Sequence, residues 1–332
     1  MPHSVPGKVL HIVDGDCARG TLREAGFRKG GEILSWRDAL YTGPVPAGLS
    51  LPQLSRVRSR FWTGGKSATE LDVRDAALAK HARYDNTVLW FGEHCVLCQL
   101  SLIQILSWFR EEGATAKRLR WVPVHAGELR PEQIANAYLS RQVVTSAQMR
   151  LAERAWRAFR QDSPNGMVRL LKADLSGIPS LRVVLTRLLQ EYPWKRSGLS
   201  RLEGELLREI RRRGKAKAGI AVGTVMWEEY VGDDLLSDMA RNFVRAPHPV
   251  LCFAEPFAGR VERREFLRSI LELTDVGRRV LAGKADHVAL NGVDRWIGGV
   301  HLEGKEVRWR WDRLAQSVVS ASGSPGTQPL KR

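Results

Sequence analysis

The sequence predicts an α/β protein with a mostly parallel N-terminal sheet flanked by helices, a helical middle segment and a winged-helix-like C-terminal α+β domain. The continuous apolar run at residues 87–91 (TVLWF) is typical of a strand buried on both faces of a sheet. Strands like this one alternate with helical segments over the first 126 residues, as in βαβ units. Three helices followed by strand-like runs predict the C-terminal domain.

The N-terminal elements follow one another as strand and helix. Residues 8–13 (KVLHIV) form the first apolar run, which ends at Asp14-Gly15-Asp16, and a helix from Cys17 to Ala25 is closed by Gly26. The other elements are strands at residues 32–36, 87–91 and 118–124 and an apolar helix at about 96–109. These elements predict an α/β domain over residues 1–126.

The middle segment, residues 127–195, is predicted to be helical and to pack on the N-terminal domain. Pro131 suits a first helical position, and Thr145 with Gln148 forms a capping box for the next helix. A leucine pattern after Pro179 predicts another helix. Residues 192–198 (YPWKRSG) are the predicted linker.

The C-terminal domain is predicted over residues 196–316. Ser200 and Glu203 form a capping box that opens its first helix. Further helices at residues 221–230 and 234–244 precede a strand-like run at 250–253. The last residues, 317–332, are rich in Ser, Gly and Pro and predict a disordered tail.

The composition excludes several classes of protein. The 332 residues are 43% hydrophobic and 27% charged, which is ordinary for a globular protein and excludes wholesale disorder. Four cysteines are too few for a disulfide scaffold, and no apolar run has the length of a membrane-spanning helix. The N-terminus shows no secretory signal, so we expect a cytoplasmic protein that does not bind membranes.

The formal net charge of +16 is spread along the chain. A nucleic-acid-binding module usually concentrates its basic residues on one face, so this charge permits an anionic partner without requiring one. Residues 208–217 (REIRRRGKAK) are the one local cluster. It is either the solvated end of a helix, which we favour, or a surface that contacts phosphates.

Polar side chains follow each predicted N-terminal strand. In open parallel sheets ligands bind outside the carboxyl ends of the strands, so these side chains predict a shared site. Glu93 or His94 would be the general base, Asp14 and Asp16 would bind a metal or hydroxyl groups, and Arg37 would contact an anion. The alternative is that the aspartates cap the following helix. The full set is Asp14, Asp16, Arg37, Asp38, Glu93, His94 and His125.

Other motifs are weaker. Residues 15–21 (GDCARGT) lack the Lys of a phosphate-binding loop, and no G-x-G-x-x-G follows a strand, so the cofactor is unknown. Cys95-x-x-Cys98 lies at a helix N-terminus and would suit a redox centre or half a zinc site, but small buried residues are the favoured interpretation. Asp294, Arg295 and Trp296 would face a ligand or, more often for such aromatic segments, pack between domains.

Three long segments resemble a known family. LHIVDGD, WRDALYTGPVP and LWFGEHCVLCQLSLIQILSWF resemble the bacterial family called domain of unknown function 1835. LTDVGRRVLAG and ALNGVDRWIGGVHL resemble its companion, domain of unknown function 3658. The resemblance covers most of residues 8–312 and implies no established reaction. It implies an acidic residue at the position of Cys95, and this departure argues against a catalytic role for the thiols.

These observations lead to three hypotheses of function. The first is an enzyme or enzyme-like binder of a small polar or phosphorylated molecule at the carboxyl edge of the N-terminal sheet. The second is a DNA-binding regulator that uses the helix at residues 234–244 with Arg241 and Arg245, although three nearby acids oppose phosphate binding. The third is a protein–protein interaction module. A small molecule is thus the favoured partner over nucleic acid, and the metal and oligomeric state stay open.

Overall fold

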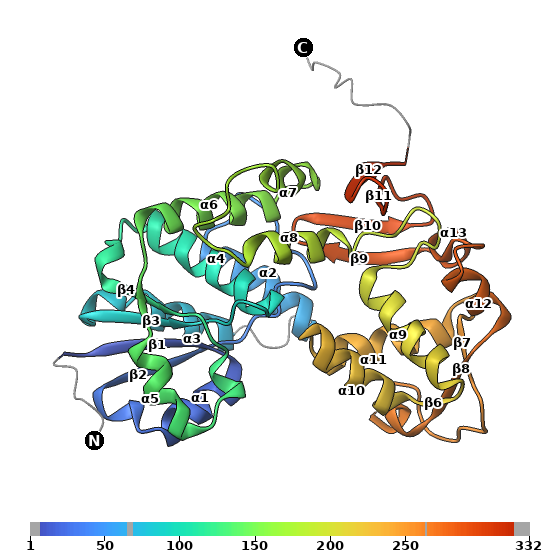
Figure 1. Cartoon of the computed structure of the whole chain (residues 1–332), viewed down its shortest axis with the longest axis horizontal. Helices are drawn as coiled ribbons and strands as arrows, with labels where there is room; N and C mark the ends of the chain where they lie inside the picture. The colour runs from blue at the N-terminus through green and yellow to red at the C-terminus, as the bar shows by residue number, and fades with distance from the viewer. Residues whose placement is uncertain (1–6, 65–68, 263, 322–332) are drawn as a thin grey trace, which may run out of the picture. The chain divides into compact units, whose positions relative to one another are not determined.

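The computed structural model describes residues 7–64, 69–262 and 264–321. The chain divides into two compact units (Figure 1). The first unit holds the chain up to Leu188 together with Trp296–His301, and the second holds Leu189–Arg295 and the chain from Leu302 onward. The predicted mixture of α/β and α+β architecture is confirmed.

A five-stranded sheet with the order β2-β1-β3-β4-β5 forms the centre of the first unit. Four strands are parallel, and β5 pairs antiparallel with β4. The inner strand β1 is buried throughout because it has neighbouring strands on both edges and helices on both faces. The strands are β1 (Val9–Asp14), β2 (Gly31–Trp36), β3 (Asn86–Trp90), β4 (Leu119–Val122) and β5 (Gln142–Val143).

The direction of the crossovers places helices on both faces of this sheet. The chain passes from β1 to β2 in one direction and from β3 to β4 in the other, so right-handed crossovers put α1 and α4 on opposite faces. In Figure 1, α1 and α5 lie below the sheet, and α4 lies above it against α6. The helices are α1 (Gly15–Glu24), α2 (Leu51–Thr63), α3 (Thr69–Leu78), α4 (Val96–Glu111), α5 (Pro131–Leu139), α6 (Ser146–Phe159), α7 (Asn165–Leu170) and α8 (Leu181–Leu189).

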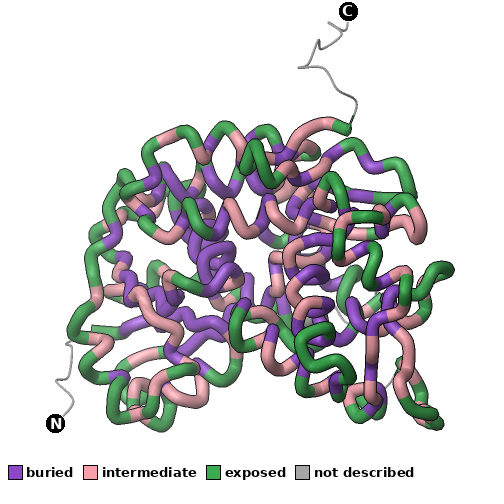
Figure 2. Tube along the Cα trace, turned by 45° about the vertical axis from the view of Figure 1, so that its right-hand side comes forward, coloured by how far each residue is buried: buried purple, intermediate pink, exposed green. Residues whose placement is uncertain are grey.

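Helix α4 is buried on almost every side, as its apolar sequence predicts (purple in Figure 2 marks buried residues). Two of its buried glutamines make hydrogen bonds within the unit. The Gln99 side chain donates to the Gly92 carbonyl at 2.8 Å, and Gln104 accepts a hydrogen bond from the Trp36 indole at 3.0 Å. The Gln99 bond therefore holds the turn from β3 into α4, and the Gln104 bond joins α4 to the end of β2.

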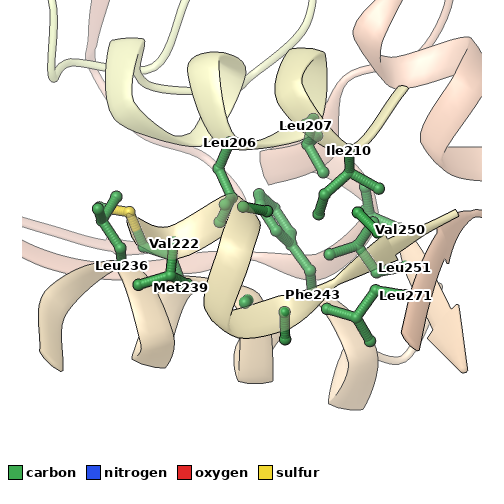
Figure 3. Packing of buried hydrophobic residues seen from close by; sticks show 14 of the residues in the cluster. Leu206, Leu207, Ile210, Val222, Leu236, Met239, Phe243, Val250, Leu251 and Leu271 are labelled. Atoms are coloured by element: carbon green, nitrogen blue, oxygen red, sulfur yellow. The ribbon is translucent and has the colours of Figure 1, made fainter. Parts of the chain in front are cut away.

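The second unit contains helices and strands in the order of a winged-helix domain. The chain runs from α9 through the short strand β6 to α10 and α11, and then to β7 and β8. The three strands form an antiparallel sheet with the order β6-β8-β7. Figure 3 shows Leu206 and Ile210 of α9 packed with Phe243 of α11 and Leu271 of β8. The elements are α9 (Arg201–Arg213), β6 (Ala216–Lys217), α10 (Ala218–Glu229), α11 (Asp233–Arg245), β7 (Leu251–Phe253) and β8 (Ile270–Leu273).

The rest of the second unit is built from short elements. Helices α12 (Asp275–Leu281) and α13 (His287–Asn291) precede the hairpin of β9 (Val293–Ile297) and β10 (Val300–Gly304), whose tip belongs to the first unit. Strands β11 (Trp309–Asp312) and β12 (Ser317–Ser320) pair antiparallel. The disordered tail expected from Ser317 is thus wrong for β12, because this segment pairs with β11, while residues 322–332 lie outside the described residues.

The predicted capping boxes form at the starts of α6 and α9. The Thr145 hydroxyl accepts the Gln148 amide hydrogen at 3.1 Å, and Ser200 accepts that of Glu203 at 3.3 Å. The predicted linker at residues 192–198 instead contains buried side chains, and Trp194 forms a β-bridge to Trp311. The boundary between the two units falls before it, at Leu188–Leu189.

Candidate active site at the sheet edge

The candidate site lies where the strand order of the sheet reverses direction. Strands β1 and β3 are neighbours, and the chain leaves their carboxyl ends toward opposite sides of the sheet. The crevice at such a switch point is where open α/β sheets bind ligands. Asp14 ends β1, the Gly92–Cys95 turn follows β3, and His125 follows β4.

Asp14 is the buried carboxylate at this point. Its side chain is almost fully covered, and Oδ2 accepts a hydrogen bond from the Cys98 thiol at 3.2 Å. The same oxygen lies 3.4 Å from Nε2 of His125. Asp14 occupies the N-cap position of α1, but within the described chain its side chain makes no capping hydrogen bond. The capping role that sequence reasoning offered as the alternative therefore does not account for Asp14.

The two thiols differ in their environments. Cys95 is the N-cap residue of α4, and its Sγ accepts the amide hydrogen of Cys98 at 3.3 Å. A hydrogen bond from the Cys98 side chain lowers the pKa of the Cys95 thiol. The same hydrogen bond, together with burial and the negative charge of Asp14, raises the pKa of the Cys98 thiol well above its ordinary value. Cys98 is thus the protonated donor of the pair.

His125 is held from three sides. The hydrogen bond to Asp14 raises the pKa of its imidazole, against the effect of burial. A β-carbon on Gly127 would lie 2.9 Å from its Cε1, and one on Gly92 would lie 3.1 Å from its backbone nitrogen. A side chain at position 127 would therefore displace the ring, and one at position 92 would crowd the backbone of His125. Its Nδ1 is buried without a hydrogen-bond partner in the described residues, with Glu128 Oε1 at 3.8 Å.

The exposed acid of the same edge has a different partner. Asp16 accepts hydrogen bonds from Arg37 at 2.6 Å and from the Ser35 hydroxyl at 3.2 Å. Arg37 also donates to Glu70 at 3.2 Å. The hydrogen bond to Asp16 raises the pKa of the Arg37 guanidinium. The predicted anion contact is therefore already paired with two carboxylates.

Asp38 lies in the interior and belongs to an ion-pair cluster. Its Oδ1 is 2.8 Å from the buried guanidinium of Arg58, and its Oδ2 is 4.0 Å from that of Arg74. Arg74 in turn pairs with Asp75 at 2.7 Å. Both guanidinium groups come from helices, α2 and α3, which this cluster ties to the end of β2. The geometry gives Asp38 a structural role.

The remaining predicted residues lie at other places. Glu93 is half-buried and His94 exposed, and both lie in the turn between β3 and α4, next to Cys95. Asp294 and Arg295 belong to the second unit, where Arg295 donates to the Glu191 carbonyl at 3.1 Å and pairs with Glu203. Trp296 belongs to the first unit and stacks on His301 with ring centroids 4.3 Å apart.

Sequence reasoning placed Asp14 and His125 at one edge but did not bring Cys98 to it. The Cys-x-x-Cys spacing at the start of a helix was the available signal, whereas the partner of Cys98 is 84 positions away. Asp14, Cys98 and His125 form the one group of three metal-ligating side chains that converge within the described residues. None of the described helices combines the length and the apolar character needed to cross a membrane.

The comparisons with known proteins add no relative. No family model matches the chain, and no curated protein matches it either. The resemblance to domain of unknown function 1835 and its companion therefore stays a prediction.

Proposed function

We propose that the N-terminal unit is an enzyme or enzyme-like binder of a small polar or phosphorylated molecule at the carboxyl edge of its sheet. The observation that carries the proposal is the convergence of Asp14, Cys98 and His125 at the point where the strand order reverses. The shifted pKa values of Cys98 and His125 at this edge favour a functional site over a purely structural one.

Two helix N-termini favour an anionic or strongly polar ligand. Helix α1 begins at Gly15 directly after β1, and α4 begins at Val96 after β3, so both start at the same edge of the sheet. Backbone N–H groups at a helix N-terminus carry partial positive charge and attract phosphate or carboxylate groups, and in α4 that of Cys98 is already bonded to Cys95 Sγ. Because Arg37 is paired with Asp16, these N-termini are the main attraction for an anion. Glu93 and His94, in the turn next to α4, are the proposed proton-transferring groups.

Native mass spectrometry of the purified protein tests this function. A molecule retained in the native mass but absent from the denatured mass is expected, and inorganic phosphate is expected to raise the melting temperature. Glu93→Ala should abolish retention of the molecule at an unchanged melting temperature of the free protein, whereas the effect of phosphate should remain because the helix N-termini are unchanged. The exposed Glu132 of α5 offers the matched control, Glu132→Ala, which should behave as wild type. A bare native mass with no effect of phosphate would contradict the proposal.

The chain order of the second unit favours DNA binding as a second candidate function. The charges of the second unit oppose DNA binding. Three acidic residues of α11 are exposed, namely Asp233, Asp234 and Asp238, and Arg241 pairs with Asp238 at 2.7 Å. Fluorescence anisotropy with duplex DNA at two salt concentrations separates the cases. Affinity that falls steeply with salt, by about one log unit per log unit of salt for each phosphate contact, would favour this candidate.

A further inference from the structure

We propose that Asp14, Cys98 and His125 form a binding site for a zinc-like divalent ion at the edge of the sheet. The ligand atoms are Oδ2, Sγ and a ring nitrogen of these side chains, and all lie within 4.8 Å of one another. The inference rests on the proposed function, because the ion would lie at the same sheet edge where the small molecule is expected to bind. It is tested separately from that function below.

The separations between these atoms fit tetrahedral coordination. Zinc binds oxygen and nitrogen at about 2.0–2.2 Å and sulfur at about 2.3 Å, so neighbouring ligand atoms lie roughly 3.3–3.8 Å apart. Asp14 Oδ2 lies 3.2 Å from Cys98 Sγ and 3.4 Å from His125 Nε2. A small adjustment of side-chain torsions would therefore bring all three atoms to bonding distance of one ion.

The chemistry of the donors selects the ion. A thiolate, an imidazole and a carboxylate suit Zn²⁺ and related transition metals, whereas Mg²⁺ and Ca²⁺ prefer oxygen atoms alone. Zn²⁺ would displace the thiol proton of Cys98. The charges of the carboxylate and the thiolate would then balance the two charges of the ion, which is important because Asp14 and Cys98 are buried.

The three side chains are held by separate elements before any ion binds. Asp14 is fixed by β1, Cys98 lies in the first turn of α4, and the His125 ring is packed against Gly127. Such positioning reduces the loss of side-chain entropy on binding. Three protein ligands leave a fourth position for water or substrate, which is the arrangement of catalytic zinc sites.

Cys95 distinguishes this site from a thiol–disulfide centre. Its Sγ accepts the Cys98 amide hydrogen and is not part of the convergent group. A metal site built on Asp14, Cys98 and His125 needs the thiolate of Cys98 alone, whereas a dithiol centre needs both cysteines. The two single variants Cys95→Ser and Cys98→Ser are therefore a matched pair.

The experiment titrates Co²⁺ and Zn²⁺ into the reduced, metal-free full-length protein. One equivalent of Co²⁺ should give a thiolate-to-cobalt absorption band, and Zn²⁺ should displace it and appear in the native mass. Cys98→Ser and Asp14→Asn should weaken binding at least about tenfold, whereas Cys95→Ser and Cys252→Ser, a cysteine of the second unit, should keep it. Circular dichroism of each variant confirms that it folds.

Two outcomes would overturn the inference. One is a titration without the absorption band and without zinc in the native mass. The other is equal loss in Cys95→Ser and Cys98→Ser, together with a disulfide between these residues in the oxidised protein. Because the probes are the metals alone, zinc binding in a protein that retains no small molecule and ignores phosphate would refute the proposed function and leave the metal site standing.

Discussion

The side chains at the carboxyl ends of the strands fall into three groups by their surroundings. Asp16 and Arg37 neutralise one another in solvent, Asp38 is enclosed with Arg58, and Asp14 is buried beside a thiol and an imidazole. Exposed ion pairs contribute about 0–1 kcal/mol, whereas removing one partner of a buried pair costs about 3–5 kcal/mol. Substitutions in these groups are therefore expected to change the free energy of unfolding by different amounts.

Asp38→Asn should lower the free energy of unfolding by about 3–5 kcal/mol, because it leaves the buried Arg58 charge uncompensated. Asp16→Asn, with 60% of its side chain exposed, should change it by less than about 1 kcal/mol. Urea denaturation at pH 7 of both variants checks the difference. Equal small effects would show that Asp38 is not a structural residue.

His11 gives the first unit a dependence on pH. It is buried in β1, its Nδ1 accepts the Trp90 indole hydrogen at 3.1 Å, and burial lowers its pKa to about 4. The unfolded chain takes up a proton below the ordinary pKa of 6.5, while folded His11 stays neutral until about 4, so lowering the pH between these values favours unfolding. Between pH 7 and pH 5 this effect amounts to about 2 kcal/mol.

The variant His11→Gln keeps an acceptor for Trp90 but cannot titrate. We therefore expect the loss of stability between pH 7 and pH 5 to be smaller in His11→Gln by about 2 kcal/mol. Urea denaturation of both proteins at the two pH values measures it. A variant that loses as much stability as the wild type would show that His11 is not the titrating group.

At the scale of elements, two glycines of the first unit have opposite requirements. Gly20 lies inside α1, where a β-carbon would meet no atom within 4 Å. Gly299 lies in the turn between β9 and β10, where a β-carbon would lie 2.0 Å from the Arg160 carbonyl oxygen. One position tolerates a side chain that the other excludes.

Gly20→Ala should stabilise the protein by about 0.5–1 kcal/mol, because alanine loses less backbone entropy in a helix. Gly299→Ala should destabilise it by more than about 2 kcal/mol, because the hairpin tip must move away from Arg160. Thermal or urea denaturation gives both values. A neutral Gly299→Ala would mean that the turn is not seated against the end of α6.

The same elements show how far the sequence predicts the structure. Apolar runs and capping boxes predict the long strands and helices because these signals are local. Strand β5, two exposed residues, carries no such pattern, and β12 exists only through its pairing with β11. In the site, strand ends predict the place of Asp14 and His125. The burial of α4 on nearly all sides hides which of its faces holds Cys98, and the partners of Asp38 come from helices that no strand pattern locates.

At the scale of the whole molecule, each unit has a hydrophobic cluster of its own. Leu206 of α9 is fully buried in the core of the second unit, and Leu206→Ala should cost about 2–5 kcal/mol. Gly20→Ala acts on α1 in the first unit, so the two changes share no neighbours. Their effects should therefore add to within about 0.5 kcal/mol in the double variant. Urea denaturation of the wild type, both single variants and the double variant completes this cycle, and a coupling above about 1 kcal/mol would show that positions 20 and 206 do not contribute independently.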